Sequence, residues 1–407
     1  DIVVCRFLDR QPDLDRPTNA RGPFGVCRDN RFGHIDAGIC CDTGLKYCAG
    51  SDPFGVAHKL ELKKGDRQHN VKTTRGLAMS DAPKTVQNSA WNYHPELPLQ
   101  DPSIFKWPPN PRFLTGWFGR NWLTLSERMM MLVLALLLWA FAYPSLETTK
   151  TFAFDWVLQI WIVNFLLITV VAGGLHWYFY TRKSQGNRLK FDRRPQAKNN
   201  KLWSFSDQVK DNIFWSLGSG VFQLSAFQSL TMWLMANGFI PTITFASNPV
   251  WFVLALLLIP IWSAFHFYWV HRLLHVPLLY KRVHSLHHRN VNIGPWSGFA
   301  MHPVEHFIYL TTLCVHWVVA SHPIHLIFHV IYQGPGAAMT HAGYEDLLVK
   351  DKRRLALGTF YHQLHHRYYE CNYGNQEMPW DRWFGTFHDG SEEATIITRD
   401  RKKTMHG

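Results

Sequence analysis

The run PVWFVLALLLIPIWSAFHFYWVHRLLHVPLLYKRVHSLHH, residues 249–288, joins an apolar segment directly to a series of histidines. Its first part, residues 249–270, is long and apolar enough to cross a bilayer. Its second part contains the pair His271 and His275, followed by the five-residue word His-x-x-His-His at His284, His287 and His288. A second copy of this word holds His362, His365 and His366. The pattern predicts a membrane helix that leads into a histidine-rich site.

The spacing of these eight histidines favours metal binding. Positions i, i+3 and i+4 share one face of a helix, so each word can present two or three nitrogens to a common point. Neutral imidazole suits iron, zinc and copper. Eight imidazoles are too many for one tetrahedral zinc ion, and they suit two ions with open positions. At this histidine frequency, chance gives about 0.07 copies of the word per chain. Hydrogen-bonded core histidines and a structural zinc site are the two plainer interpretations.

The composition is that of a membrane protein with several spans. The chain is 47% hydrophobic and 15% aromatic, and it contains 18 Trp. We expect spans at residues 129–143, 154–180 and 249–270, a weaker span at 213–241, and a tight hairpin at 305–334 with a break near 321–323. The predicted fold class is therefore all-α: a polytopic membrane helical bundle with a cytoplasmic helical cap that holds a histidine-rich di-metal site.

The basic residues predict the orientation. A net charge of +12 can indicate nucleic-acid binding, but the Lys and Arg residues cluster beside the spans, so we expect no nucleic-acid partner. Residues 181–211 carry nine Lys or Arg, which places this loop in the cytoplasm. All three groups of histidines then face the cytoplasm. We expect a multi-pass integral membrane protein, in a bacterial inner membrane rather than the endoplasmic reticulum, because we find neither a fused cytochrome domain nor a retrieval signal.

Composition divides the chain into four parts. Residues 1–78 form a polar, cysteine-containing extension of doubtful origin, since Met79 reads as an ordinary start. Residues 79–128 form a Pro- and Trp-rich N-terminal arm. We expect the catalytic domain at 129–390 and a polar C-terminal tail at 391–407.

From about Trp251 to Gly390 the chain resembles the sterol desaturase/fatty acid hydroxylase superfamily of integral-membrane, non-haem di-iron enzymes. The resemblance rests on residues 271–288, MHPVEH at 301–306, HAGYE at 341–345, HQLHH at 362–366 and NYGNQEMPWDRWFGTF at 372–387. It covers roughly a third of the chain. It implies that two Fe ions, for which zinc is a possible substitute, use O2 as co-substrate to hydroxylate or desaturate a lipid.

The resemblance also implies roles for individual residues. The metal ligands would be His271, His275, His284, His287, His288, His341, His362, His365 and His366. His302 is a further candidate near the metals. A ligating histidine usually donates its second N–H to a carboxylate or carbonyl, and Glu305, Glu345, Asp346 and Asp381 are the acids nearest in sequence. Asp381 is equally suited to locking a C-terminal turn. Five basic residues suit either an acidic electron donor or phospholipid headgroups: Arg272, Lys281, Arg282, Arg289 and Arg367.

The expected function is a sterol desaturase-like reaction, either that of a C-5 desaturase or that of a methyl oxidase. The substrate would be a lipid or sterol, and a cytochrome b5 or ferredoxin with its reductase would supply electrons. A fatty acid or other lipid hydroxylase, a carotenoid hydroxylase and an alkylglycerol monooxygenase are related alternatives. A membrane acyl desaturase is disfavoured because only eight residues separate His275 from His284. A membrane metal-binding or transport protein is the alternative from another class, although transporters usually place such ligands near the bilayer midplane.

Overall fold

The computed structural model describes residues 25–26, 39–40 and 91–406, in two separate units, Asp1–Lys84 and Thr85–Gly407. In the first unit, strands β1 (Gly25–Val26) and β2 (Ile39–Cys40) pair antiparallel. The other predictions for residues 1–90, including the start at Met79, lie outside the described residues. All that follows concerns the second unit.

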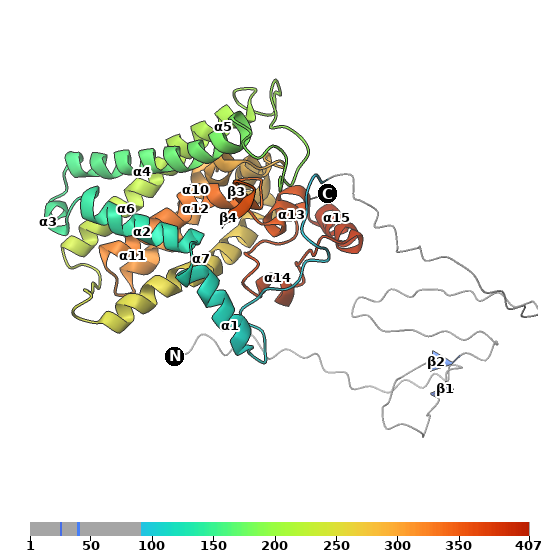
Figure 1. Cartoon of the computed structure of the whole chain (residues 1–407), viewed down its shortest axis with the longest axis horizontal. Helices are drawn as coiled ribbons and strands as arrows, with labels where there is room; N and C mark the ends of the chain where they lie inside the picture. Colours follow the sequence, from blue (N-terminus) through green and yellow to red (C-terminus); the bar gives the residue numbers. More distant parts are fainter. Residues whose placement is uncertain (1–24, 27–38, 41–90, 407) are drawn as a thin grey trace, which may run out of the picture. The chain divides into compact units, whose positions relative to one another are not determined.

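Helices dominate the second unit, as predicted (Figure 1). Its first half contains α1 (Pro111–Phe118), η1 (Gly119–Leu123), α2 (Glu127–Phe141), α3 (Leu146–Thr149), α4 (Phe154–His176), η2 (Trp177–Thr181), α5 (Gln208–Trp215), η3 (Ser216–Gly220), α6 (Val221–Ala236) and α7 (Pro249–Leu274). The second half contains α8 (Pro277–Leu279), η4 (Tyr280–His284), α9 (Ser285–His288), η5 (Pro295–Phe299), α10 (Pro303–Leu310), η6 (Thr311–Trp317), α11 (Pro323–Gln333), α12 (Pro335–Thr340), α13 (Phe360–Tyr368), α14 (Trp380–Trp383) and α15 (Glu392–His406).

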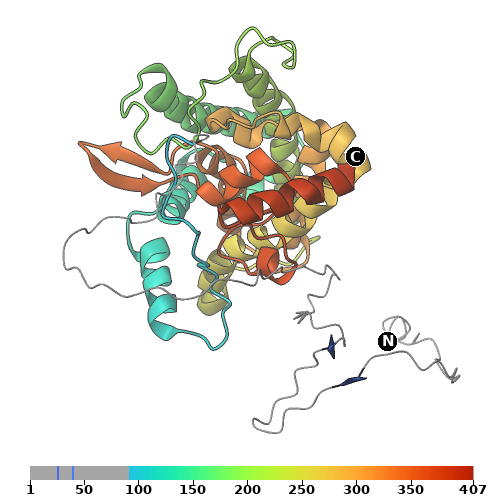
Figure 2. The same cartoon turned by 90° about the vertical axis from the view of Figure 1, so that its right-hand side faces the viewer.

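A small β-hairpin is a regular element of this unit that the sequence did not predict. Strands β3 (Asp346–Val349) and β4 (Lys352–Ala356) pair antiparallel, and the hairpin projects from the side of the helical body (Figure 2). Lys350 and Asp351, between the two strands, both have positive φ. Neither lysine nor aspartate indicates such a turn as strongly as glycine does, so the sequence predicts this hairpin only weakly.

Helix starts follow local capping rules. The Asn110 side chain accepts a hydrogen bond from the backbone N–H of Phe113, and Pro111 occupies the first position of α1. Asn248 and Pro249 repeat this arrangement at the start of α7. In its described part, which begins at residue 91, the Pro/Trp-rich arm is therefore irregular only as far as residue 110. Beyond that point it becomes helical, because a side-chain cap followed by proline favours a helix start.

Three helical stretches are long and apolar enough to cross a membrane: Pro111–Phe141, Phe154–Thr181 and Pro249–Leu274. They contain the predicted spans 154–180 and 249–270 and all but the last two residues of the predicted span 129–143. The weaker span expected at 213–241 forms the helices α5, η3 and α6 but is not among these three stretches. The hairpin expected at 305–334 appears as α10 and η6, then α11, with the break at residues 318–322 where it was predicted.

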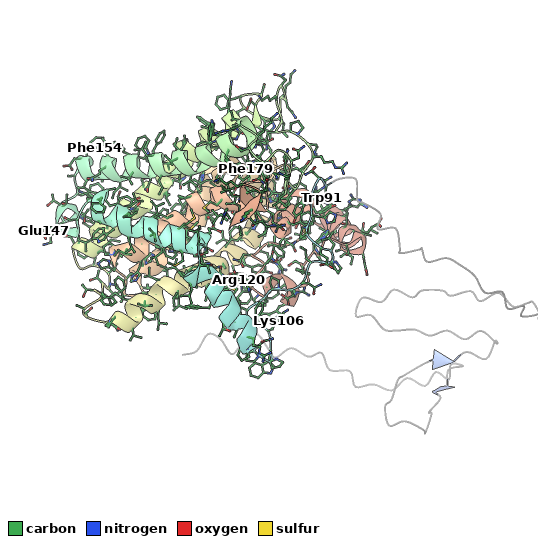
Figure 3. The ribbon with its side chains drawn as sticks, viewed as in Figure 1. Trp91, Lys106, Arg120, Glu147, Phe154 and Phe179 are labelled. Carbon is green, nitrogen blue, oxygen red and sulfur yellow. The ribbon has the colours of Figure 1, made fainter. Side chains whose placement is uncertain are left out.

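The long helices pack side by side and point towards one end of the unit. α2 contacts α11, and α4 contacts α6. Glu147 and Phe154, labelled in Figure 3, mark the end of the bundle opposite Trp91. Trp91 packs with Phe360 and Leu364 of α13 in a small second core. The helix ends near α13 therefore meet the segments that carry the histidines.

Candidate metal centre

Nine buried or nearly buried histidines converge in two sets, and they are the nine that the sequence analysis named. The first set contains His271, His275, His284, His288 and His365, and the second contains His287, His341, His362 and His366. Within each set, one ring nitrogen of every histidine lies within 4.8 Å of the corresponding nitrogens of the others. A spacing of this size is what several ligands around one ion require. The structure thus brings every predicted ligand together and divides the ligands between two positions.

Each His-x-x-His-His word contributes to both sets. In the first word, His284 and His288 join the first set while His287 joins the second. In the second word, His362 and His366 join the second set while His365 joins the first. Residues at i and i+4 lie nearly above one another on a helix, whereas i+3 is rotated to one side. The two adjacent histidines that end each word therefore belong to different sets. The first word gives two histidines to the first set and one to the second, and the second word does the opposite.

The remaining three ligands come from two further elements. His271 lies in the last turn of α7 and His275 caps its end, so the membrane helix delivers both to the first set. His341 follows α12 and belongs to the second set. α12 packs closely on η5, where a Cβ at Gly298 would lie 2.0 Å from the Ala337 carbonyl oxygen. Glycine at position 298 allows this approach, and the same carbonyl accepts a hydrogen bond from His341.

The outer nitrogens of the histidines fix their protonation. Nδ1 faces a backbone carbonyl in four of them: His271 at 2.6 Å from Tyr373, His365 at 2.6 Å from Cys371, His341 at 2.9 Å from Ala337 and His287 at 3.3 Å from Ala300. In two more, Nδ1 faces a carboxylate. Because these acceptors require a donor, Nδ1 carries the proton and Nε2 presents its lone pair.

The Nε2 atoms converge within each set. Six of the nine histidines have the Nδ1 acceptors just described, whereas Nδ1 of His288 and His366 is buried without a partner. Nε2 of His341 lies 2.9 Å from Nε2 of His362 and 3.1 Å from Nε2 of His366. In the first set, Nε2 of His288 lies 3.2 Å from that of His275 and 3.0 Å from that of His365. Nε2 atoms that carry no proton would repel one another at such distances, whereas a cation between them would be coordinated by their lone pairs. The donor set therefore fits two metal ions.

Two buried carboxylates orient ligands of the first set. Glu305 Oε1 lies 2.7 Å from His284 Nδ1, and Glu370 Oε1 lies 3.0 Å from His275 Nδ1. Glu305 was predicted from the sequence, whereas Glu370 was missed. Glu370 follows Tyr369, whose positive φ of 72° ends α13, so helical spacing from His366 gave no guide to its position. Tyr373 donates its hydroxyl proton to Glu370 and places its carbonyl against His271.

Burial keeps the imidazoles neutral. Removal from water lowers the pKa of His284 to about 3 and that of His287 to about 4. The pKa values of His288, His365 and His366 also fall well below the ordinary value, first because of burial and then because neighbouring histidines disfavour a second positive charge. Neutral imidazole is the form that binds metal, so these residues need not lose a proton near neutral pH.

A cavity of about 580 Å³ reaches both sets. Its wall includes His271 and His284 of the first set and His287, His341 and His362 of the second. Apolar groups from several elements line the space beside them: Phe267 of α7, Met301, Tyr309 of α10 and Leu357. The volume is typical of a site that encloses a small organic molecule. The arrangement can hold an apolar ligand directly beside the metal ions.

Other predicted residues lie apart from the centre. Glu345 and Asp346 pair with Arg353 at the β-hairpin. Asp381 accepts hydrogen bonds from the backbone N–H groups of Tyr373 and Gly374, so its turn-locking role is confirmed. His302 caps α10 through Nδ1 and belongs to neither set. These residues shape the surroundings and do not contact the two ligand sets.

The basic residues near the histidines divide into two groups. Arg289 and Arg367 form ion pairs with Asp211 and Asp192, and Arg272 donates to the Tyr268 hydroxyl. Lys281 and Arg282 are exposed. Only the exposed pair is free to meet a partner molecule, within the part of the chain that the structure describes.

A bundle with membrane-length helices and two sets of buried histidines defines a histidine-box membrane metalloprotein. The sequence model of the family described as fatty acid hydroxylase matches residues 222–386. The chain belongs to the sterol desaturase/fatty acid hydroxylase superfamily. The matched residues include all nine histidines of the two sets.

Named relatives are sterol desaturases of fungi and plants. The chain is 30% identical to Delta(7)-sterol 5(6)-desaturase ERG3B of Gibberella zeae over 33% of this chain and 42% of that protein. It is 27% identical to Delta(7)-sterol-C5(6)-desaturase of Nicotiana tabacum over 58% of this chain and 86% of that protein. The Delta(7)-sterol 5(6)-desaturase erg3B of Aspergillus fumigatus is also 27% identical, over 56% of this chain and 67% of its own length. No solved structure gives a significant match.

Proposed function

We propose that this protein is a membrane-bound, O2-dependent di-iron oxidoreductase that acts on a sterol-like lipid. The observation that carries the proposal is the convergence of the ring nitrogens of nine buried histidines in two sets at the wall of one cavity. Family membership and the sterol desaturase relatives support the choice of iron and of a lipid substrate.

Iron is needed because no side chain can attack an unactivated C–H bond. Two bound iron ions would supply the oxidation of such a bond with O2 as co-substrate. The nine histidines would hold the ions, while Glu305 and Glu370 keep His284 and His275 in the tautomer that ligates. The backbone carbonyls of Tyr373, Cys371, Ala337 and Ala300 do the same for four more ligands.

The cavity would choose the carbon that reacts. Phe267, Tyr309 and Leu357 exclude water and hold the lipid in a fixed position beside the ligand sets. The ligands lie at the end of α7, so a lipid in the bilayer can reach the cavity without leaving its apolar surroundings. We favour desaturation of a sterol ring, as the names of the relatives suggest, with oxidation of a sterol methyl group as the second possibility.

A separate electron donor completes the reaction. We assign this role to a cytochrome b5 or a ferredoxin with its reductase. The exposed Lys281 and Arg282 lie in η4, and the ring centre of Tyr280 in this element lies 4.7 Å from that of His406 at the end of α15. α15 adds further basic residues, among them Arg399 and Lys403. A basic surface so near the first ligand set suits an acidic donor.

We also propose that the centre faces the cytoplasm. The support is the positive charge of residues 181–211, which follow the span Phe154–Thr181 on the same side as the histidines. A single cysteine placed near Asn290 should react with reagents admitted to the cytoplasmic side. Reaction from the opposite side alone would refute this orientation.

Comparative lipid analysis tests the proposed function. Membranes of cells with and without the gene are compared under oxygen, with the variant His365→Ala as the matched control. We expect one sterol or related lipid to lose two hydrogen atoms, and we expect this change to require O2 and the wild-type chain. If no lipid changes in cells that contain the iron-loaded protein and a donor, a metal-binding or transport role becomes the better explanation.

A further inference from the structure

A charged pair at the start of α2 lines the same cavity as the metal centre. We propose that Glu127 and Arg128 bind the hydroxyl group of the substrate, so that the enzyme selects neutral lipid alcohols over fatty acids. The inference rests on the proposed function only in assuming that the cavity holds the lipid. It assigns a binding role to residues that lie far from every histidine word in the sequence.

Arg128 has an unsatisfied donor. Its side chain is 8% exposed, its Nη2 lies 2.6 Å from Glu377 Oε2, and its guanidinium stacks 5.2 Å from the centre of the Trp117 ring. Its Nη1 is buried and has no hydrogen-bond partner. A buried donor without a partner costs about 1–3 kcal/mol, and more when it is charged. Because Arg128 lines the cavity, an oxygen atom of a ligand is a suitable missing partner.

Glu127 supplies the complementary acceptor. Its side chain is half-buried and lines the cavity, and it makes no hydrogen bond or ion pair with any residue in the described part of the chain. Its Oε1 lies 3.8 Å from the place where a Cβ would stand on Gly336. The carboxylate therefore faces α12, the helix that leads to His341. Glu127 and Arg128 together offer one acceptor and one donor to the cavity.

The local charges favour an alcohol. Glu127 and Glu377 both line this part of the cavity, and Arg120 and Arg128 balance them. A fatty acid carboxylate could accept from Arg128 Nη1 but could not donate to Glu127, whose carboxylate would repel it. A hydroxyl group carries no charge, accepts a hydrogen bond and donates another. It can therefore satisfy Arg128 and Glu127 at the same time.

The position of this pair also restricts where the lipid reacts. His341 of the second set follows Gly336, which lies beside Glu127, by five positions along α12. This is a rise of about 7.5 Å along a helix. A hydroxyl bound at Glu127 would hold the hydroxyl-bearing end of the lipid near the metal centre. We therefore expect oxidation close to that end rather than at the far end of the tail.

Ligand binding to the full-length protein in nanodiscs tests the proposal independently of turnover. The probes are a 3-hydroxysterol, its methyl ether, which cannot donate, and a long-chain fatty acid. The wild type should bind the alcohol roughly tenfold more tightly than the ether, the size expected for one hydrogen bond to a charged group. It should bind the fatty acid most weakly. Glu127→Ala should remove the preference for the alcohol while leaving the affinity for the ether unchanged.

Two further variants complete the test. Arg128→Met should also weaken binding of the alcohol, but it leaves Glu377 unpaired and can disturb folding, whereas Glu127→Ala keeps that ion pair. Arg188→Gln is the matched control, because it breaks the exposed pair with Asp351 away from the cavity. Equal affinity of the wild type for alcohol and ether, or an intact preference in Glu127→Ala, would overturn the proposal. If the wild type prefers the alcohol but no lipid is oxidised, the result would contradict the proposed function and leave the proposed binding role of Glu127 and Arg128 intact.

Discussion

Two groups of buried histidines lie in this unit, and they differ in what their nitrogens face. In the metal centre, Nε2 atoms from four or five histidines converge on one position in each set. In the second group, the hairpin histidines His316, His325 and His329 of η6 and α11, ring nitrogens meet ordinary partners. His316 Nδ1 lies 2.8 Å from Ser321 Oγ, and His325 Nε2 lies 2.9 Å from the Phe252 carbonyl oxygen. Burial alone therefore does not identify a metal site. The convergence of ring nitrogens from several histidines on one position does.

The hairpin histidines satisfy one another without a cation. His316 Nε2 lies 3.1 Å from His329 Nδ1, and His329 Nε2 lies 3.0 Å from Ser263 Oγ. Each imidazole in this row of hydrogen bonds can donate from one nitrogen and accept at the other. Hydroxyl groups at the ends serve as donor or acceptor as required. We conclude that these histidines stabilise the helical hairpin and hold no metal.

Loss of one metal ligand should give the largest effect. His365→Ala removes a ligand of the first set, and His287→Ala removes one of the second. Each variant should lower the iron content of the purified protein from two ions per chain to about one or fewer, and turnover should fall to background. Metal analysis and a lipid oxidation assay measure the two effects. Full activity in either variant would refute the assignment of that set.

Removal of a buried carboxylate should give a smaller loss. Glu370→Gln and Glu305→Gln keep the size of the side chain but weaken the acceptor for a ligand N–H. We expect metal affinity to fall about 10–100-fold. Competition with a chelator measures the change. Glu345→Gln, at the β-hairpin, is the matched control and should leave metal affinity unchanged.

A hairpin histidine should affect stability without affecting the metals. His316→Ala removes the partner of His329 Nδ1 and one of the two partners of Ser321 Oγ. It should lower the free energy of unfolding by about 1–3 kcal/mol. Denaturant unfolding in detergent measures this change, and metal analysis of the same sample supplies the contrast with His365→Ala. A fall in iron content in folded His316→Ala protein would erase the distinction between the two groups.

Deletion of residues 1–78 should have the smallest effect. Within the described part of the chain, both ligand sets and the cavity wall consist of residues from 102 onward. Protein expressed from Met79 should insert into the membrane and oxidise the same lipid at the wild-type rate. Failure of insertion or a large loss of activity would show that the extension belongs to the working protein.

The sequence predicted the parts of the centre that depend on side-chain spacing. All nine histidines were identified, because His-x-x-His-His is a local helical pattern and His341 lies in a family segment. The division of each word between two sets was not foreseen, although the rotation of i+3 relative to i and i+4 explains it. Glu370 was missed because the chain leaves the helix at Tyr369. The carbonyl partners and the contribution of α2 to the cavity depend on tertiary contacts and have no local signature.

Anomalous X-ray diffraction at the iron edge, from crystals of protein purified from iron-replete cells, tests the central claim most directly. We predict two iron peaks per chain, one among His271, His275, His284, His288 and His365 and the other among His287, His341, His362 and His366. A single peak, or iron located away from these two sets in active protein, would contradict the account.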